Sequence, residues 1–176
     1  KGQAGPTLGL GEKPKSLPRP NPQGKVNPLL LAFASGYTWI ARGYAYDVKG
    51  LKELIKEGIA HRGLAFLHVL QPCPTYNDLH TKEWFAPRLY RLEEEGYDPL
   101  VPPGLPPEAL EARMARFQQK ALEWGERIPV GVFWKAELPT FEARLKAYLP
   151  RYPEAYPARG PETPLDLEGL LQEFAL

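Results

Sequence analysis

The chain has 176 residues, enough for one ordinary domain with a buried core, and its formal net charge of +1 argues against nucleic acid or an anionic membrane surface as a partner. Its longest apolar run, Leu29 to Ala34, is too short to span a bilayer, and a single cysteine excludes an internal disulfide. These features predict a soluble cytoplasmic protein. The 21 prolines are about twice the average usage of roughly 5%, a composition also found in proteins of thermophiles.

Residues 1–28 are rich in glycine and proline, which predicts a loop without periodic structure. A loop of this length is uncommon in a compact domain unless it is functional or disordered. Its first residues, Lys1-Gly2-Gln3 with Gly5-Pro6-Thr7, could line an anion site, since glycine N–H groups and a lysine charge both attract phosphate. The glycine spacing is not that of a Walker motif, and composition alone favours a flexible linker.

The next segments predict a strand–helix–strand unit. Asn27 as N-cap and Gly36 as the stop bound a short helix, and Tyr37 to Arg42 forms the first strand. Asp47 caps an amphipathic helix, and residues 64–70 are nearly all apolar, as expected of a strand buried on both faces. Such a unit implies parallel strands with a right-handed crossover, and ligands of parallel sheets lie beyond the carboxyl ends of the strands.

The second half of the chain predicts four more elements and an arm. The pattern indicates helices over Lys82–Glu95 and Pro107–Glu123, a strand over Ile128–Lys135 and a short helix over Pro139–Leu149. Residues 150–176 are punctuated by prolines and end in a small amphipathic segment, which predicts an arm laid over a surface of this molecule or of a partner.

Cys73 follows the second predicted strand, in the region where such folds carry their chemistry. Free cysteines are most often buried and inert. The prolines on both sides of Cys73, however, hold the backbone extended and remove amide donors, which would suit a rigidly held metal ligand. His61, His68 and His80 form neither a hydrolase triad nor a zinc-protease motif. His68 lies within an apolar strand and is predicted to be a core residue.

Several segments resemble the beta subunits of 2-oxoacid:ferredoxin oxidoreductases. The opening "KGQAGPT" is similar to the K-G-Q-x-S-P-T loop of that family, and "PCPTYN" is similar to its PC-x-T-x-N turn. The "ARG" at the end of the first strand and the segment "IPVGVFWKAELPTFEARL" resemble further family segments. The resemblance covers residues 1–148, and the K-G-Q loop and the Pro-Cys turn are its specific parts.

The resemblance implies an α/β thiamine diphosphate-binding fold, with a mostly parallel sheet flanked by helices and a proline-rich C-terminal arm. Residues 1–149 are then the C-terminal part of the domain that binds the diphosphate of the cofactor, and residues 150–176 are the arm. The implied reaction is oxidative decarboxylation of a 2-oxoacid with coenzyme A, giving an acyl-CoA and CO₂. Electrons pass through a [4Fe–4S] cluster to ferredoxin, and the enzyme is completed by an alpha subunit, or by alpha and gamma subunits.

The resemblance also assigns residues. Lys1 matches the catalytic loop lysine, which offers positive charge to the 2-oxoacid carboxylate, and Gly2 and Gln3 match the loop that shapes the cofactor pocket. Cys73 matches one of four cysteine ligands of the cluster. Gly5 stands where the family has serine, so a hydroxyl contact is lost or made by water. The Gly-Asp-Gly motif for Mg²⁺ and diphosphate, and the other three cysteines, are expected upstream of residue 1.

Two other functions remain open at this stage. One is a non-catalytic assembly subunit of the same fold, in which the arm from Pro150 wraps a partner. The other is a cluster-free thiamine diphosphate decarboxylase of the acetolactate synthase type, in which the Pro-Cys-Pro turn is incidental. Neither the 2-oxoacid nor the subunit stoichiometry follows from the sequence.

Overall fold

The computed structural model describes residues 3–150, 169 and 172. The chain divides into two compact units, residues 1–138 and 139–176. The second unit contains the short helix α5 (Phe141–Tyr148), capped by the Thr140 hydroxyl, which accepts a hydrogen bond from the Ala143 N–H at 3.2 Å. The predicted arm of residues 150–176 lies almost wholly outside the described residues, and the boundary at residue 149 stays a prediction. No helix within the described part of the chain is long and apolar enough to cross a bilayer.

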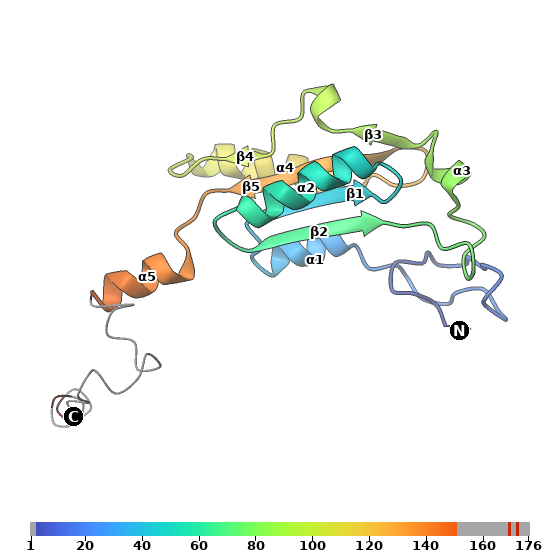
Figure 1. Cartoon of the computed structure of the whole chain (residues 1–176), viewed down its shortest axis with the longest axis horizontal. Helices are drawn as coiled ribbons and strands as arrows, with labels where there is room; N and C mark the ends of the chain where they lie inside the picture. Colours follow the sequence, from blue (N-terminus) through green and yellow to red (C-terminus); the bar gives the residue numbers. More distant parts are fainter. Residues whose placement is uncertain (1–2, 151–168, 170–171, 173–176) are drawn as a thin grey trace. The chain divides into compact units, whose positions relative to one another are not determined.

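A five-stranded sheet forms the centre of the first unit (Figure 1). Its strands are β1 (Trp39–Tyr44), β2 (Ala65–Leu70), β3 (Leu89–Arg91), β4 (Leu100–Val101) and β5 (Ile128–Ala136). The order is β2-β1-β5-β3, and β4 also pairs with β5. The β1–β2, β3–β5 and β4–β5 pairs are parallel, whereas β1 and β5 run antiparallel. The predicted α/β fold with a mostly parallel sheet is therefore confirmed.

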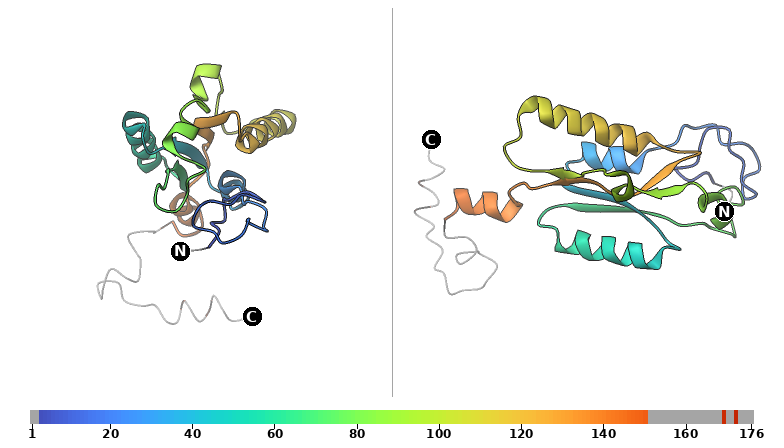
Figure 2. Two further views of the ribbon diagram at one scale, coloured as in Figure 1. Left: turned by 90° about the vertical axis from the view of Figure 1, so that its right-hand side faces the viewer. Right: turned by 90° about the horizontal axis from the view of Figure 1, so that it is seen from above.

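Helices cover both faces of this sheet (Figure 2). On one face, α1 (Pro28–Ala34) and α4 (Pro107–Leu122) pack over β1 and β5, and on the other α2 (Val48–Ala60) packs over β1 and β2. The main apolar core lies beneath α1 and α4. At its centre Phe117 is fully buried, with its ring centroid 4.7 Å from that of Phe33 and 5.8 Å from that of Trp134.

The two predicted helix caps are confirmed. Asn27 Oδ1 accepts hydrogen bonds from the backbone N–H groups of Leu29 and Leu30 at 3.0 and 3.2 Å. Asn27 Nδ2 donates to the Ala121 carbonyl at 2.8 Å, so the same side chain also ties the start of α1 to the end of α4. Asp47 Oδ1 accepts from the Gly50 N–H at 3.0 Å at the start of α2. Side chains of this type satisfy N–H groups that the helix itself leaves without acceptors.

Three sequence predictions need correction. Residues 82–95 do not form one helix but a short helix, α3 (Lys82–Phe85), then β3, then the 3₁₀ turn η1 (Glu93–Glu95). The reason is Pro87, which lacks an N–H and so cannot donate the hydrogen bond that would continue α3. The first strand begins and ends two residues later than predicted. β2 is an edge strand and mostly half-exposed, so its predicted burial on both faces is wrong.

Replacing Phe117 by alanine should lower the free energy of unfolding by about 3–5 kcal/mol, because it removes a fully buried ring and leaves a cavity under α4. Chemical denaturation of the purified protein measures this change. The matched control is Leu122→Ala in the same helix, whose side chain is 63% exposed and whose loss should cost less than about 0.5 kcal/mol. Equal losses in the two variants would contradict this location of the core.

Candidate functional site

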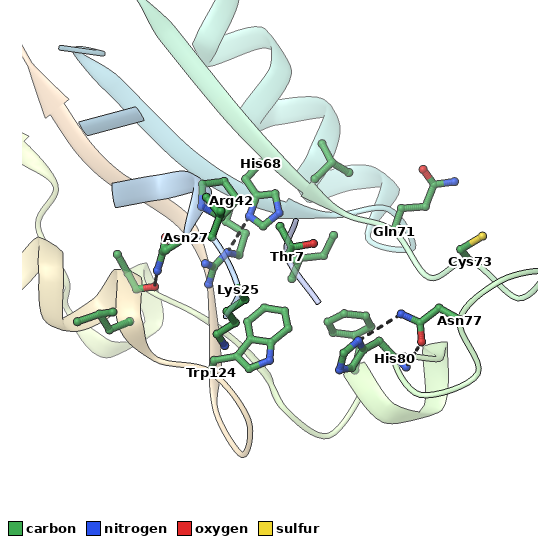
Figure 3. A pocket seen from close by; sticks show the side chains of 17 residues that line it. Thr7, Lys25, Asn27, Arg42, His68, Gln71, Cys73, Asn77, His80 and Trp124 are labelled. Atoms are coloured by element: carbon green, nitrogen blue, oxygen red, sulfur yellow. Dashed lines mark hydrogen bonds between the residues drawn. The ribbon is translucent and has the colours of Figure 1, made fainter. Parts of the chain in front are cut away.

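A pocket opens at the carboxyl ends of β1 and β2 (Figure 3). Its volume is about 290 Å³. The two strands contribute Arg42 and His68, the N-terminal loop contributes Lys25, and the segment after α4 contributes Trp124. The turn that follows β2 contributes Cys73 to the rim. The position matches the general rule for ligand sites in sheets with parallel strands.

Arg42 lies on β1, of which every residue is buried, and is itself only 2% exposed. Its Nε donates to His68 Nδ1 at 3.3 Å, and its Nη1 donates to the Pro129 carbonyl at 3.4 Å. The rings of Phe133 and Trp124 lie 5.3 and 5.8 Å from the guanidinium carbon. Burial lowers the pKa of the Arg42 guanidinium to about 10, which still leaves it charged at neutral pH.

His68 is held beside Arg42 by the pairing register, because the two residues are partners across the parallel β1–β2 pair. Burial, with a smaller effect of the Arg42 charge, lowers the pKa of His68 to about 4, so the ring is neutral at pH 7. The guanidinium can only donate, so His68 Nδ1 must accept, and the ring proton is assigned to Nε2. The prediction that His68 is a core residue is therefore replaced by a half-buried ring that lines a pocket.

Lys25 adds a second positive charge to the pocket. Its Nζ lies 4.8 Å from the centroid of the Trp124 ring, a cation–π arrangement. Partial burial lowers the pKa of Lys25; Glu12 opposes this effect and Arg42 adds to it. Among the described residues that line the pocket there is no aspartate or glutamate. The pocket therefore has cationic and hydrogen-bond-donor character.

Cys73 lies in a tight turn directly after β2 and is exposed. Its carbonyl accepts hydrogen bonds from the N–H groups of Tyr76 and Asn77 at 3.2 and 2.9 Å. Asn77 Oδ1 in turn accepts from the N–H groups of Leu79 and His80, at 2.9 and 3.0 Å. The thiol is thus displayed on an ordered turn, and the alternative of a buried, inert cysteine is wrong.

The N-terminal loop is tied to this turn. Lys15 Nζ donates to the Pro74 carbonyl at 2.5 Å, and the Lys15 backbone N–H donates to Asp78 Oδ1 at 2.7 Å. Glu12 Oε1 lies 3.3 Å from His80 Nε2. In Figure 1 the loop and the segment after β2 lie at the same end of the sheet. Residues distant in sequence therefore build one edge of the site.

The loop has no helix or strand between residues 3 and 26, as predicted, but it is internally organised. Asn21 is 3% exposed, and its Nδ2 lies within 3.0 Å of the carbonyl oxygens of Leu8, Gly9 and Gln23. Leu8 and Leu17 are buried beneath the loop. The backbone of Asn21 also pairs with Gly11 and Glu12, so this residue joins distant parts of the loop through both its backbone and its side chain, and nothing in the composition indicated it.

The structure describes only two of the four site residues assigned from the sequence, Gln3 and Cys73. Lys1 and Gly2 lie outside the described residues, so their predicted roles remain predictions. Gln3 is exposed and is not among the residues that line the pocket. Cys73 is the only predicted site residue that the described structure brings to the pocket, and sequence reasoning missed Arg42 as a site residue. The sequence feature that could have indicated Arg42 is its position as a charged residue within an otherwise apolar predicted strand.

The described residues do not form a complete metal site. No group of three or more histidine, cysteine, aspartate or glutamate side chains gathers in the part of the chain that the structure describes. Cys73 is the only cysteine of the chain, so it can give one thiolate where a [4Fe–4S] cluster commonly needs four. Any cluster or Mg²⁺ held near this turn requires ligands from other residues.

The low pKa of His68 predicts a pH-dependent stability. The folded-state pKa of about 4 is below the unfolded value of about 6.5, so the stability that the neutral ring contributes is full above pH 6.5 and is lost as the pH falls towards 4. His68→Gln keeps an acceptor for Arg42 but does not titrate. When the pH falls from 7 to 4.5, the free energy of unfolding should decrease in both proteins. The decrease should be about 2 kcal/mol smaller in His68→Gln than in the unchanged protein.

Denaturant titrations at both pH values measure this difference. The comparison at pH 7.5, where both side chains are neutral, separates the effect of lost packing from that of titration. Parallel stability profiles for His68→Gln and the unchanged protein would show that His68 is not held neutral in the fold.

The sequence and the fold match the same group of known proteins. Residues 73–149 match the family model for the C-terminal region of the pyruvate ferredoxin oxidoreductase beta subunit. The 2-oxoacid:ferredoxin oxidoreductase subunit beta of a Sulfolobus species is 56% identical over 161 residues, covering 90% of this chain and 52% of the relative. That of Saccharolobus solfataricus is 50% identical over 182 residues, covering 98% of this chain and 58% of the relative.

A solved structure has the same fold. It is the 2-oxoglutarate:ferredoxin oxidoreductase from Magnetococcus marinus, solved with 2-oxoglutarate, coenzyme A and succinyl-CoA bound, and it matches with a TM-score of 0.69 and 24% identity. The match covers 100% of this chain and 54% of that one. The chain spans about half the length of the curated relatives it matches. Over 90% or more of its residues this chain is thus 50–56% identical to beta subunits of 2-oxoacid:ferredoxin oxidoreductases, and residues 73–149 match the family model of the C-terminal region of such a subunit.

Proposed function

We propose that this chain works in an enzyme that oxidatively decarboxylates a 2-oxoacid in the presence of coenzyme A. One 2-oxoacid, one coenzyme A and two oxidised ferredoxins give one acyl-CoA, one CO₂, one proton and two reduced ferredoxins. The observation that carries the proposal is the 50–56% identity to beta subunits of such enzymes over at least 90% of the chain. Because those relatives are about twice as long, the activity is proposed for the assembled enzyme and not for these residues alone.

The proposal includes three cofactors. Thiamine diphosphate supplies the carbanion chemistry when bound, Mg²⁺ holds its diphosphate, and a [4Fe–4S] cluster carries electrons one at a time. Lys1 would place a positive charge next to the carboxylate of the 2-oxoacid, and Gly2 and Gln3 would shape the cofactor pocket. Cys73 would give one thiolate to the cluster, a role that its exposure on an ordered turn permits. The remaining ligands must come from residues that this chain does not contain.

The partners follow from the same reaction. An alpha subunit, or alpha and gamma subunits, would complete the active site, and ferredoxin would collect the electrons. The turn that carries Cys73 leaves the thiol exposed, so a partner segment can reach it without local unfolding. The side chain of the 2-oxoacid is left to experiment, because its selection would involve the partner subunit.

The decisive assay is anaerobic reduction of a viologen dye by the purified complex. We expect reduction that requires a 2-oxoacid, coenzyme A and thiamine diphosphate together, and a panel of 2-oxoacids then identifies the substrate. Absence of reduction with iron and thiamine diphosphate verified as bound would point to a different thiamine reaction. Absence of both cofactors would point to an assembly subunit, and either result would reject the proposed function.

Replacing Cys73 by serine tests the cluster separately. The variant should contain less iron and acid-labile sulfide per protein, and its viologen reduction should fall by at least about tenfold, the scale of a change in the ligand sphere of a metal. Tyr76→Phe is the matched control in the same turn, since its ring is 46% exposed and it loses only a hydroxyl. Unchanged iron content in Cys73→Ser would show that Cys73 is not a cluster ligand.

A further inference from the structure

The pocket contains a buried cation without a counter-ion. Arg42 is 2% exposed, and its two hydrogen-bond acceptors in the described structure, His68 Nδ1 and the Pro129 carbonyl, are both neutral. No ion pair joins Arg42 to a carboxylate anywhere in the described residues. A charge removed from water in this way is costly unless an opposite charge compensates it.

The unused donors of this cation face the pocket. Within the described residues, the buried side-chain polar atoms that lack both a partner and solvent are Tyr44 Oη and Arg88 Nε. Arg42 Nη2 is not one of them, although no acceptor is found for it, so it keeps access to the pocket. His68 Nε2–H, fixed as a donor by the contact with Arg42, lies next to it (Figure 3). Two adjacent side chains therefore present free donors to one space.

The charged side chains that line the pocket in the described structure are positive. Lys25 adds its ammonium beside Trp124, and none of the pocket-lining residues in the described part of the chain carries a carboxylate. Glu12 is the acid that raises the pKa of Lys25, and its Oε1 lies 3.3 Å from His80 Nε2. Asn27 and Asn77 also line the pocket, but their side chains serve the backbone at α1 and at the cysteine turn. Arg42 therefore has no carboxylate partner in the described structure, and Lys25, whose charge Glu12 favours, adds a second positive charge without a direct ion pair among the described residues.

We propose that this pocket binds the phosphate or diphosphate group of an organic phosphate, held by Arg42, His68 and Lys25. Two positive charges match a dianion, whereas a carboxylate would leave one of them uncompensated. Arginine and lysine are the usual side chains for such groups, with arginine offering two parallel donors. The volume of about 290 Å³ and the ring of Trp124 leave room for an organic part beside the phosphate. The inference rests on these side chains and not on the proposed function.

The test is a calorimetric titration of pyrophosphate into the intact protein with its cofactors bound, so that no empty cofactor site takes up the probe. We expect saturable binding. Arg42→Met should weaken it by about tenfold or more, since charged hydrogen bonds are lost, and Lys25→Gln by a smaller, severalfold factor because Lys25 is exposed. Lys13→Gln is the matched control, because it removes the same charge from the same loop but does not line the pocket.

Two outcomes of these titrations would overturn the proposal. If Arg42→Met does not fold, Lys25→Gln against Lys13→Gln decides alone, because both side chains are exposed. Absence of saturable binding would overturn the proposal. Equal affinities in Lys25→Gln and Lys13→Gln would overturn it as well. Displacement of the bound pyrophosphate by coenzyme A would support the site and identify the phosphate of that substrate as its ligand. Binding that coenzyme A does not displace would support the site with another organic phosphate as its ligand.

Discussion

The complete burial of β1 is the constraint on which the site depends. β1 pairs with β2 on one side and with β5 on the other, and helices cover both of its faces. A strand in that position normally carries apolar side chains only, yet one of its six buried residues is Arg42. The guanidinium must then find partners within reach of a fixed backbone. The register supplies His68 on one neighbouring strand and the Pro129 carbonyl on the other.

These partners are sufficient to orient the guanidinium but not to neutralise it. Aromatic faces at 5.3 and 5.8 Å add attraction without a full negative charge. A carboxylate at position 68 would have formed a closed ion pair, whereas a neutral histidine leaves the positive charge uncompensated. The same pairing forces the imidazole proton to Nε2. One structural contact thus sets the charge and the donor pattern of the whole pocket.

The sequence predicted what depends on local rules. Asn27 and Asp47 could be identified as caps because their hydrogen bonds reach only two or three residues. Pro87 was equally local, and overlooking it produced one helix where the chain forms α3, β3 and η1. The pocket could not be predicted in this way, because Arg42 and His68 meet through strand pairing across 26 residues. Asn21 organises the N-terminal loop through contacts that no periodicity encodes.

The roles of Lys1, Gly2, Gln3 and Cys73 came from resemblance, and the fold explains only the last of them. Cys73 follows β2 by three residues, on a turn held by its own carbonyl and fastened to Lys15. Cys73 and Arg42 line the same pocket, but they differ in chemistry: one is an exposed thiol, and the other is a buried guanidinium without a carboxylate partner in the described structure. β2 carries His68 and leads directly into the turn of Cys73, so the two features lie side by side along one segment of the chain.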